Sequence, residues 1–168
     1  MNKDLRSKLA STEMLILDVD GVLTDGRLFY GSGGIEMKAF NAHDGYGIKT
    51  LQQQGISIAI VSGRTSDIVE KRARELGIRF LYQNVAQKNQ VLEELSKESG
   101  IDPQHMVHVG DDLPDLALFQ HVGLGIAVAD ARLEVRKSAD FITKAKGGEG
   151  AVREVCELLL ASRLEQQE

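Results

Sequence analysis

Short apolar runs separated by amphipathic segments dominate the pattern of this chain. Residues 14–17 read M-L-I-L, residues 56–61 read I-S-I-A-I-V, and residues 106–109 read M-V-H-V. Each run is followed by glycine or by charged or hydroxyl residues. Runs of this length and boundary are typical of strands that are buried on both faces of a parallel sheet.

Apolar residues with helical spacing occupy the segments between these runs. Ile68, Val69, Ala73 and Leu76 form one such stripe, and Gly77 ends it. The pattern predicts helices over residues 44–54, 65–76, from Lys88 onward, and over 113–120, 132–137 and 150–163. Further strands are predicted at residues 80–82, 123–128 and 140–143, and a short helix or lead-in at residues 1–12.

Strands that alternate with helices predict an α/β fold: a Rossmann-like, mainly parallel sheet with helices on both faces. We interpret residues 1–168 as one domain, because 168 residues suit a single core and no linker or repeat interrupts them. A domain that covers the site would need about 50 residues between the motifs. No interval is free for such an insertion, so no cap domain is expected.

Residues 27–40 depart from the strand–helix rhythm. The G-S-G-G sequence at 31–34 precedes the alternation of Ile35, Met37 and Ala39 with polar neighbours, which predicts a β-hairpin that projects from the sheet. The hairpin carries more apolar residues than it can bury by itself. We therefore expect a neighbouring subunit to cover it.

Composition and charge narrow the class of partner. A net charge of −5 argues against a nucleic-acid or anionic-membrane surface, since phosphate binding needs a basic face. The N-terminal segment lacks a signal-peptide core, and no apolar run approaches a membrane span. The single Cys156 fits a structural thiol in a reducing compartment. We expect a cytoplasmic protein with a small-molecule partner.

Polar residues follow several of the predicted strands. Asp18 and Asp20 follow the first strand, Ser62 follows the second, and Asp111 and Asp112 follow the strand at 106–109. Ligands of open α/β sheets bind at the carboxyl ends of the strands, so these side chains should converge there. A pair of carboxylates in such a place needs a cation.

The order of these residues resembles the haloacid dehalogenase superfamily of aspartyl-phosphate phosphotransferases. The motifs that carry the likeness are D-V-D-G-V-L-T at 18–24, S-G-R at 62–64, Lys88, and G-D-D-L-P-D at 110–115. The F-N-A-H-D-G-Y-G segment at 40–47 and G-G-E-G-A-V-R-E-V at 147–155 resemble, more narrowly, the capless 3-deoxy-D-manno-octulosonate 8-phosphate phosphatases.

The resemblance implies roles for four catalytic residues. Asp18 would attack the phosphate ester and form an aspartyl phosphate that water then hydrolyses. Asp20 would protonate the sugar alkoxide, which is a poor leaving group at neutral pH. Ser62 would donate a hydrogen bond to a phosphoryl oxygen, and Lys88 would neutralise charge on the nucleophile and the phosphoryl group. In related transport ATPases threonine stands in place of Asp20, so Asp20 favours a phosphatase or mutase.

The remaining assignments also rest on the resemblance. Asp18, the backbone carbonyl of Asp20, and Asp111 would bind Mg²⁺, which prefers hard oxygen ligands. Either Asp112 or Asp115 would orient Lys88 or a metal-bound water. The substrate-binding residues would be basic, with a guanidinium shaped for a carboxylate: Arg64, Arg72 and Arg153. Relatives often carry an acidic residue and a glycine where this chain has Gln87 and Asn84.

The resemblance implies a Mg²⁺-dependent phosphomonoesterase that releases phosphate from 3-deoxy-D-manno-octulosonate 8-phosphate in lipopolysaccharide precursor synthesis. It also implies a homotetramer with the hairpins at the interface and the C-terminal segment from Gly147 near a neighbour's active site. A phosphatase of a nine-carbon sialic-type acid 9-phosphate is the near alternative, which Arg64 disfavours. A non-catalytic oligomeric binding module is the third reading. None of the four histidines is assigned to a metal, and His105 and His108 are interpreted as structural.

Overall fold

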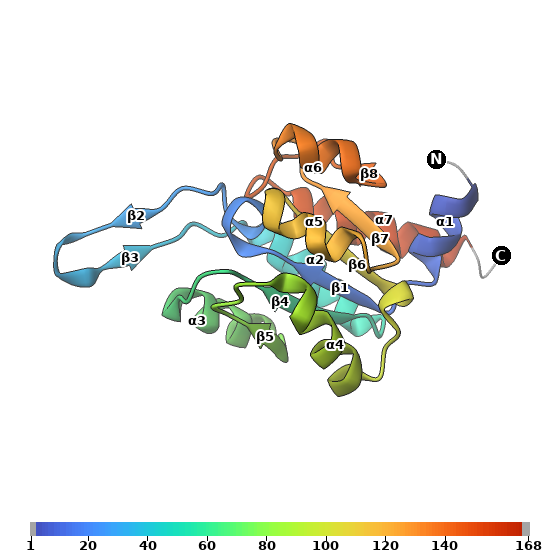
Figure 1. The fold of residues 1–168 in the computed structure, drawn as a ribbon, viewed down its shortest axis with the longest axis horizontal. Coiled ribbons are helices and arrows are strands. Elements are labelled where there is room, and N and C mark those ends of the chain that lie inside the picture. The colour runs from blue at the N-terminus through green and yellow to red at the C-terminus, as the bar shows by residue number, and fades with distance from the viewer. Residues whose placement is uncertain (1–2, 166–168) are drawn as a thin grey trace.

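A six-stranded parallel sheet forms the centre of the molecule in the computed structural model, which describes residues 3–165. The strand order is β5-β4-β1-β6-β7-β8. The bounds are β1 (Met14–Leu17), β4 (Ser57–Val61), β5 (Phe80–Tyr82), β6 (Met106–Gly110), β7 (Leu124–Ala127) and β8 (Phe141–Ile142). The strands lie side by side with helices around them (Figure 1). The predicted α/β fold is confirmed.

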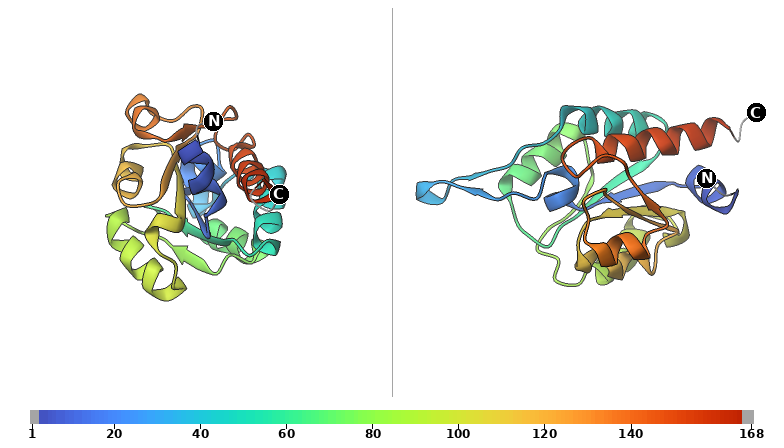
Figure 2. Two further views of the ribbon diagram at one scale, coloured as in Figure 1. Left: turned by 90° about the vertical axis from the view of Figure 1, so that its right-hand side faces the viewer. Right: turned by 90° about the horizontal axis from the view of Figure 1, so that it is seen from above.

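Helices cover both faces of the sheet, as the views in Figures 1 and 2 show. Leu15 and Leu17 face one layer of the core, and Met14 and Ile16 face the other. The first layer is built with α1 (Lys3–Ala10), α2 (Ala42–Gln53), α3 (Asp67–Leu76), α6 (Leu133–Ser138) and α7 (Ala151–Leu164). The second layer is built with α4 (Lys88–Ser99) and α5 (Leu116–Phe119).

The central strand β1 sets the position of the site. In the parallel register Leu17 lies opposite Ile60 of β4 and opposite Val109 of β6. The residues that follow these three positions therefore leave the sheet at the same edge. Asp18, Ser62 and Asp111 come to that edge for this reason, although they are far apart in the sequence.

Two helix starts differ from the sequence prediction. The second helix begins at Ala42, not at Asp44, because the Asn41 side chain caps it by accepting a hydrogen bond from the His43 backbone N–H at 2.8 Å. The third helix begins at Asp67, after Ser66 in extended conformation. The predicted helix 113–120 is a 3₁₀ turn, Leu113–Asp115, continued by α5.

The hairpin consists of β2 (Phe29–Tyr30) and β3 (Glu36–Met37), paired in antiparallel fashion. It extends away from the sheet, at the end opposite to α1 (Figures 1 and 2). Its apolar residues are among the most exposed large hydrophobic residues of the described chain, with Ile35 and Met37 each 57% exposed. Within residues 3–165 no second domain follows the hairpin, which agrees with the absence of a cap.

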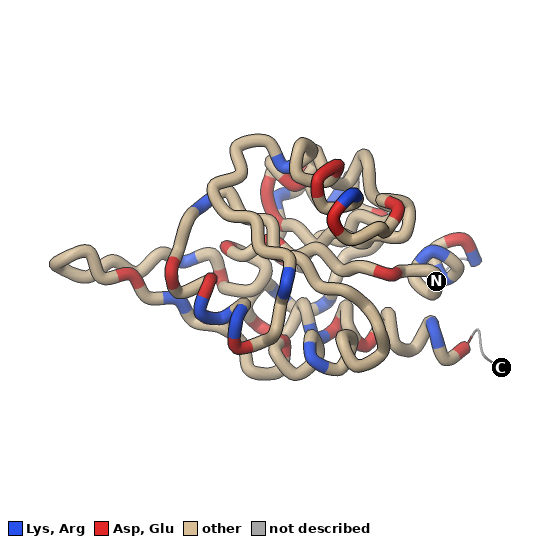
Figure 3. Tube along the Cα trace, turned by 90° about the horizontal axis from the view of Figure 1, so that it is seen from below, with Lys and Arg blue, Asp and Glu red and all other residues tan. Residues whose placement is uncertain are grey.

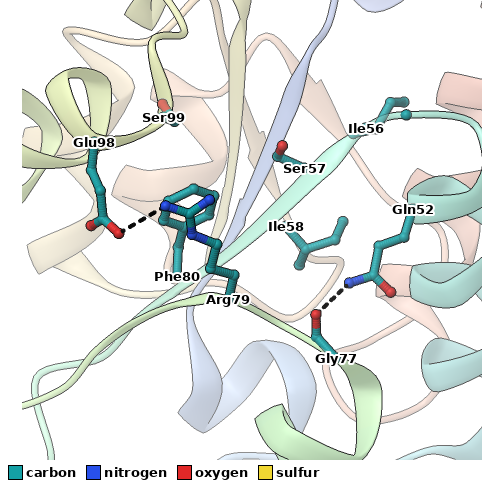
Figure 4. A pocket seen from close by; sticks show the side chains of 10 residues that line it. Gln52, Ile56, Ser57, Ile58, Gly77, Arg79, Phe80, Glu98 and Ser99 are labelled. Carbon is teal, nitrogen blue, oxygen red and sulfur yellow. Dashed lines mark hydrogen bonds and ion pairs between the residues drawn. The ribbon is translucent and has the colours of Figure 1, made fainter.

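A separate cavity lies away from the carboxyl edge of the sheet. This cavity of about 360 Å³ lies where β4 and β5 begin, lined by residues that include Ser57, Arg79 and Glu98 (Figure 4). The aspartates that follow β1 and β6 do not line it. Basic and acidic residues are interspersed along the trace in Figure 3. Among the described residues no helix is long and apolar enough to cross a bilayer.

Candidate active site

A buried ion-pair network stands at the carboxyl end of β1. The Lys88 ammonium lies 2.9 Å from Asp18 Oδ1 and 2.6 Å from Asp115 Oδ1. Lys88 is the first residue of α4, so that helix delivers the side chain to the sheet edge, where it is only 5% exposed. Burial opposes the charge on Lys88, but both carboxylates raise its pKa above the ordinary value. The ammonium is therefore fixed against the expected nucleophile.

Asp111 lies beside this network, and its surroundings suit a bound cation. The carboxylate oxygens of Asp18, Asp111 and Asp115 come within 4.8 Å of one another. The buried Asp111 Oδ1 accepts no hydrogen bond from the described residues. Burial, together with the charges of Asp18 and Asp115, raises the pKa of Asp111 to about 8. A cluster of close carboxylates with a free buried oxygen matches the hard-oxygen donor set of Mg²⁺.

Gly21 lets the loop after β1 approach Asp111. A Cβ at position 21 would lie 2.1 Å from Asp111 Oδ2, and the backbone of Gly21 has a φ of +94°. Only glycine meets both demands, because other residues rarely adopt such a φ and would collide with the carboxylate. The D-x-D-G sequence thus has a steric reason for its glycine.

Asp115 is saturated by four donors. Its Oδ1 accepts hydrogen bonds from Lys88 and His108, and its Oδ2 accepts from the backbone N–H groups of Asp111 and Asp112. Burial opposes its ionisation, yet the His108 and Lys88 contacts hold the pKa of Asp115 well below its usual range. With four donors on its two oxygens, Asp115 has no acceptor site left over for a metal ion.

Asp112 plays a different part from Asp115. It is exposed and caps the turn at Leu113–Asp115, where its side chain accepts from the Leu113 N–H at 2.8 Å. Of the two residues predicted to orient the lysine, Asp115 contacts Lys88, and Asp112 forms neither a hydrogen bond nor an ion pair with it.

Ser62 is buried in the loop that follows β4. Its backbone N–H donates to the Tyr82 carbonyl at 2.9 Å, and its own carbonyl accepts from Val85 at 3.1 Å. Asn84, in the same loop, has a φ of +57°. Asparagine tolerates this left-handed conformation better than most residues, so it can stand where relatives often have glycine. The loop thus holds Ser62 at the edge with its hydroxyl near the turn.

A second charge network surrounds Asp20 and is supplied largely by the hairpin. Lys38 forms an ion pair with Asp20 Oδ1, and Arg64 Nε lies 3.5 Å from Asp20 Oδ2. Glu36 joins the two cations, at 3.5 Å from Lys38 and 3.4 Å from Arg64. A hydrogen bond from Ser66 at 2.7 Å, with Lys38 nearby, lowers the pKa of Glu36. The hairpin is thus tied to the expected acid.

Lys38, Glu36 and His108 were not assigned to the site from the sequence. A signal for two of them existed, since alternation places Glu36 and Lys38 on one face of the hairpin and the apolar Ile35 and Met37 on the other. That pattern does not reveal which face meets Asp20. The only indication for His108 in the sequence is that it is a polar residue within an apolar strand.

Arg72 and Arg153 lie around the start of α2 rather than in contact with the carboxylates. Arg72 stacks over the Phe40 ring at 5.7 Å, and Arg153 stacks over the Tyr46 ring at 4.9 Å. The Arg153 backbone N–H also donates to buried Asp44 at 2.7 Å. Of the three predicted substrate arginines, only Arg64 forms an ion pair with an expected catalytic side chain, Asp20.

The glycine-rich segment at 147–150 packs on its own chain. Gly147 donates to Asp130 at 3.0 Å and Gly148 donates to the Val22 carbonyl at 3.0 Å, so the turn lies on the loop after β1. The 14-residue helix α7 follows directly and packs on α2 and α1. That this segment also lies near a neighbouring subunit's active site stays a prediction.

Comparisons with known proteins agree with this geometry. The haloacid dehalogenase-like hydrolase family matches residues 80–155. The 3-deoxy-D-manno-octulosonate 8-phosphate phosphatase of Escherichia coli strain K12 is 44% identical over 163 residues, which cover 97% of this chain and 87% of that protein. The protein of the same name from Salmonella typhi is 45% identical over 157 residues, covering 94% and 84%.

Solved structures lead to the same family. The crystal structure of the phosphatase from Yersinia pestis matches with a TM-score of 0.96 and 41% identity, covering 99% of this chain and 90% of that one. The phosphatase from Moraxella catarrhalis, in complex with magnesium, phosphate and KDO, matches with a TM-score of 0.95 and 41% identity, covering 99% and 96%. On likeness over nearly its whole length, this chain belongs to the 3-deoxy-D-manno-octulosonate 8-phosphate phosphatase family of haloacid dehalogenase-like hydrolases.

Proposed function

We propose that this protein hydrolyses 3-deoxy-D-manno-octulosonate 8-phosphate to the free sugar acid and phosphate, with Mg²⁺ as cofactor. The observation that carries the proposal is the contact of Lys88 with Asp18, next to the free oxygen of Asp111. A phosphate monoester repels a carboxylate nucleophile unless cations neutralise both. This edge supplies the nucleophile, a fixed ammonium and a place for a divalent ion.

Each protein group has a definite task in the proposed reaction. Asp18 attacks the phosphorus, the ester P–O bond breaks, and Asp20 gives its proton to the leaving sugar oxygen. Asp20 then takes a proton from water as the water oxygen attacks the phosphorus and returns the Asp18 carboxylate. Lys88 balances charge on the phosphoryl oxygens, and Ser62 donates a hydrogen bond to one of them. Both transfers use one site.

Asp18, Asp111 and the backbone carbonyl of Asp20 fit the magnesium ligands in this proposal. Bound Mg²⁺ supplies electrostatic stabilisation of the phosphoryl oxygens. The neighbouring aspartates give a matched test of the ligand set. Asp111→Asn should abolish the Mg²⁺-dependent rise in melting temperature, whereas Asp112→Asn should keep it, because Asp112 lies outside the cluster. Equal loss in both variants would contradict the assignment.

Arg64 supports an acidic sugar as substrate. Its guanidinium lies against Asp20 and is 41% exposed, so it can meet a substrate carboxylate that enters beside the acid. The decisive experiment is phosphate release from 3-deoxy-D-manno-octulosonate 8-phosphate and from a nine-carbon sialic-type acid 9-phosphate. We expect a higher kcat/KM for the eight-carbon substrate. Equal or reversed preference would favour the nine-carbon alternative. If neither substrate nor any other sugar phosphate were turned over, the non-catalytic reading would stand.

A cytoplasmic homotetramer that serves lipopolysaccharide precursor synthesis is part of the proposal. The exposed apolar hairpin supports association, because Tyr30 is 66% exposed and Ile35 57% exposed. Sedimentation of the wild type at micromolar concentration should give a tetramer. Ile35→Glu should give smaller species, and Leu133→Glu, at an exposed leucine of α6, should not. A monomeric wild type would overturn the tetramer.

A further inference from the structure

His108 is a fully buried histidine for which the reaction so far has no task. It lies on β6 and shares a face of the strand with Met106. Its Nε2 lies 2.9 Å from Asp115 Oδ1, and its Nδ1 lies 3.3 Å from the Ile16 carbonyl oxygen. The ring also meets Phe119 edge-on, at 5.6 Å between centroids. Three elements of the fold therefore fix its orientation.

The two oxygens of Asp115 accept hydrogen bonds from different groups. Oδ2 accepts two backbone N–H groups of the loop that carries Asp111, at 2.9 and 3.1 Å. Oδ1 accepts the two side-chain donors, Lys88 at 2.6 Å and His108 at 2.9 Å. His108 therefore touches the oxygen that meets the lysine and not the oxygen that shapes the loop.

The donor must be the histidine in this contact. A carboxylate accepts hydrogen bonds and has none to give, so the proton lies on His108 Nε2. A buried polar ring in an apolar strand is costly to leave unpaired, and here Nε2 has the Asp115 carboxylate as its acceptor. The ring and the carboxylate therefore hold each other in place beneath Lys88.

We propose that His108 is a positioning residue for phosphoryl transfer: its Nε2–H fixes Asp115 Oδ1 so that Lys88 stays in contact with Asp18. This inference rests on the proposed phosphatase function for its kinetic readout. Lys88 has three N–H donors, of which Asp18 and Asp115 occupy two. The third is free for a phosphoryl oxygen only while Asp115 keeps its place.

Variants at position 108 separate the hydrogen bond from the shape of the ring. His108→Phe keeps a ring against Phe119 but has no donor, and we expect kcat to fall about 10-fold or more. KM and the Mg²⁺ concentration for half-maximal activity should stay within about threefold, because the Asp111 loop is held through Oδ2. His108→Gln retains an N–H donor and should recover most of the lost kcat. His105→Gln, at an exposed histidine paired with Glu13, is the matched control and should be unchanged.

A double-mutant cycle shows whether His108 acts through Asp115. In an Asp115→Asn background the change His108→Phe should alter kcat by less than about twofold, because the carboxylate that it positions is gone. A loss in that background as large as in the wild type would overturn the proposal. So would a folded His108→Phe enzyme with kcat within twofold of wild type.

A measurement on the wild type keeps the inference testable if the phenylalanine variant does not fold. Long-range ¹H–¹⁵N NMR of the labelled protein should show a proton on His108 Nε2, with a resonance that moves in Asp115→Asn. An unprotonated Nε2 would overturn the proposal. This readout needs no turnover, so it separates failure of the His108 inference from failure of the proposed phosphatase function, which a wild type inactive on every sugar phosphate would indicate.

Discussion

Two charge networks meet at the carboxyl edge of the sheet, and they are held in different ways. In the inner network Lys88 joins Asp18 and Asp115 under cover of the core, with Asp115 only 1% exposed. In the outer network Lys38 and Arg64 pair with Asp20 and Glu36. The hairpin supplies two of these four residues, Glu36 and Lys38. The first is fixed by the sheet and α4, whereas the second depends on an element that projects from the domain.

The difference separates two parts of the proposed chemistry. The inner network holds the proposed nucleophile and its charge balance, which every phosphate ester requires. The outer network contains the proposed acid, Asp20, and the exposed Arg64, where the leaving sugar would lie. A buried inner site beside an outer site that the hairpin supplies would let one fold keep the same transfer chemistry and vary its substrate. The following variants test this separation, from the largest expected effect to the smallest.

Loss of Lys88 should have the largest effect. Lys88→Met leaves two buried carboxylates without their cation, which costs about 3–5 kcal/mol of unfolding free energy, and kcat should fall about 10³-fold. Lys97→Met is the matched control, because Lys97 forms an exposed pair with Glu93 and should change neither. Urea denaturation and initial rates measure both quantities. A Lys88→Met enzyme that kept a tenth of the activity would show that the inner network is dispensable.

Loss of Lys38 should have a smaller effect and one confined to the outer network. Its side chain is 1% exposed and pairs with Asp20, so Lys38→Met should lower kcat/KM for the sugar phosphate about 10- to 100-fold. Its effect on turnover of a small activated aryl phosphate should be slight, because such a leaving group needs no proton. Arg27→Met, at an exposed pair with Asp25, is the control. Equal losses on both substrates would show instead that Lys38 balances charge for both reactions and does not act on the leaving group alone.

The difference in acid stability between wild type and Asp115→Asn should report the inner network. The pKa of Asp115 is lowered in the folded protein, so its contribution to stability is present above the unfolded value of about 3.9 and is lost as pH falls through the folded pKa. The contribution is about 2 kcal/mol. Unfolding free energy between pH 6 and pH 2.5 should therefore fall more steeply in wild type than in Asp115→Asn. Parallel curves would contradict the assignment of Asp115 as the charged partner.

The smallest effect is expected for Glu36→Gln. Glu36 links Lys38, Arg64 and Ser66. When glutamine replaces Glu36, both cations keep their contact with Asp20. We expect KM to rise about two- to fivefold with kcat unchanged, because the amide oxygen of glutamine can still accept hydrogen bonds from Ser66 and Arg64. Steady-state kinetics measure the split. A large fall in kcat would show that Glu36 controls the acid itself.

The local pattern was sufficient for the frame of the site. Apolar runs with flanking glycines located the strands, and the rule that ligands bind at their carboxyl ends brought Asp18, Ser62 and Asp111 to one edge. The register of β1 with β4 and β6 confirms that placement. Helix starts were less well predicted, because Asn41 was not recognised as the cap of α2.

The sequence by itself determined the parts of this protein that depend on neighbours in the chain: the alternation of strands and helices, the glycine at position 21, and the acidic residues that follow β1 and β6. Only the tertiary structure decided the partners. Lys38 reaches Asp20 across 18 positions, Lys88 reaches Asp115 across 27, and His108 reaches Asp115 across 7. Such contacts depend on the approach angle of the hairpin and of α4, which periodicity does not encode, and on the competition of four donors for one carboxylate.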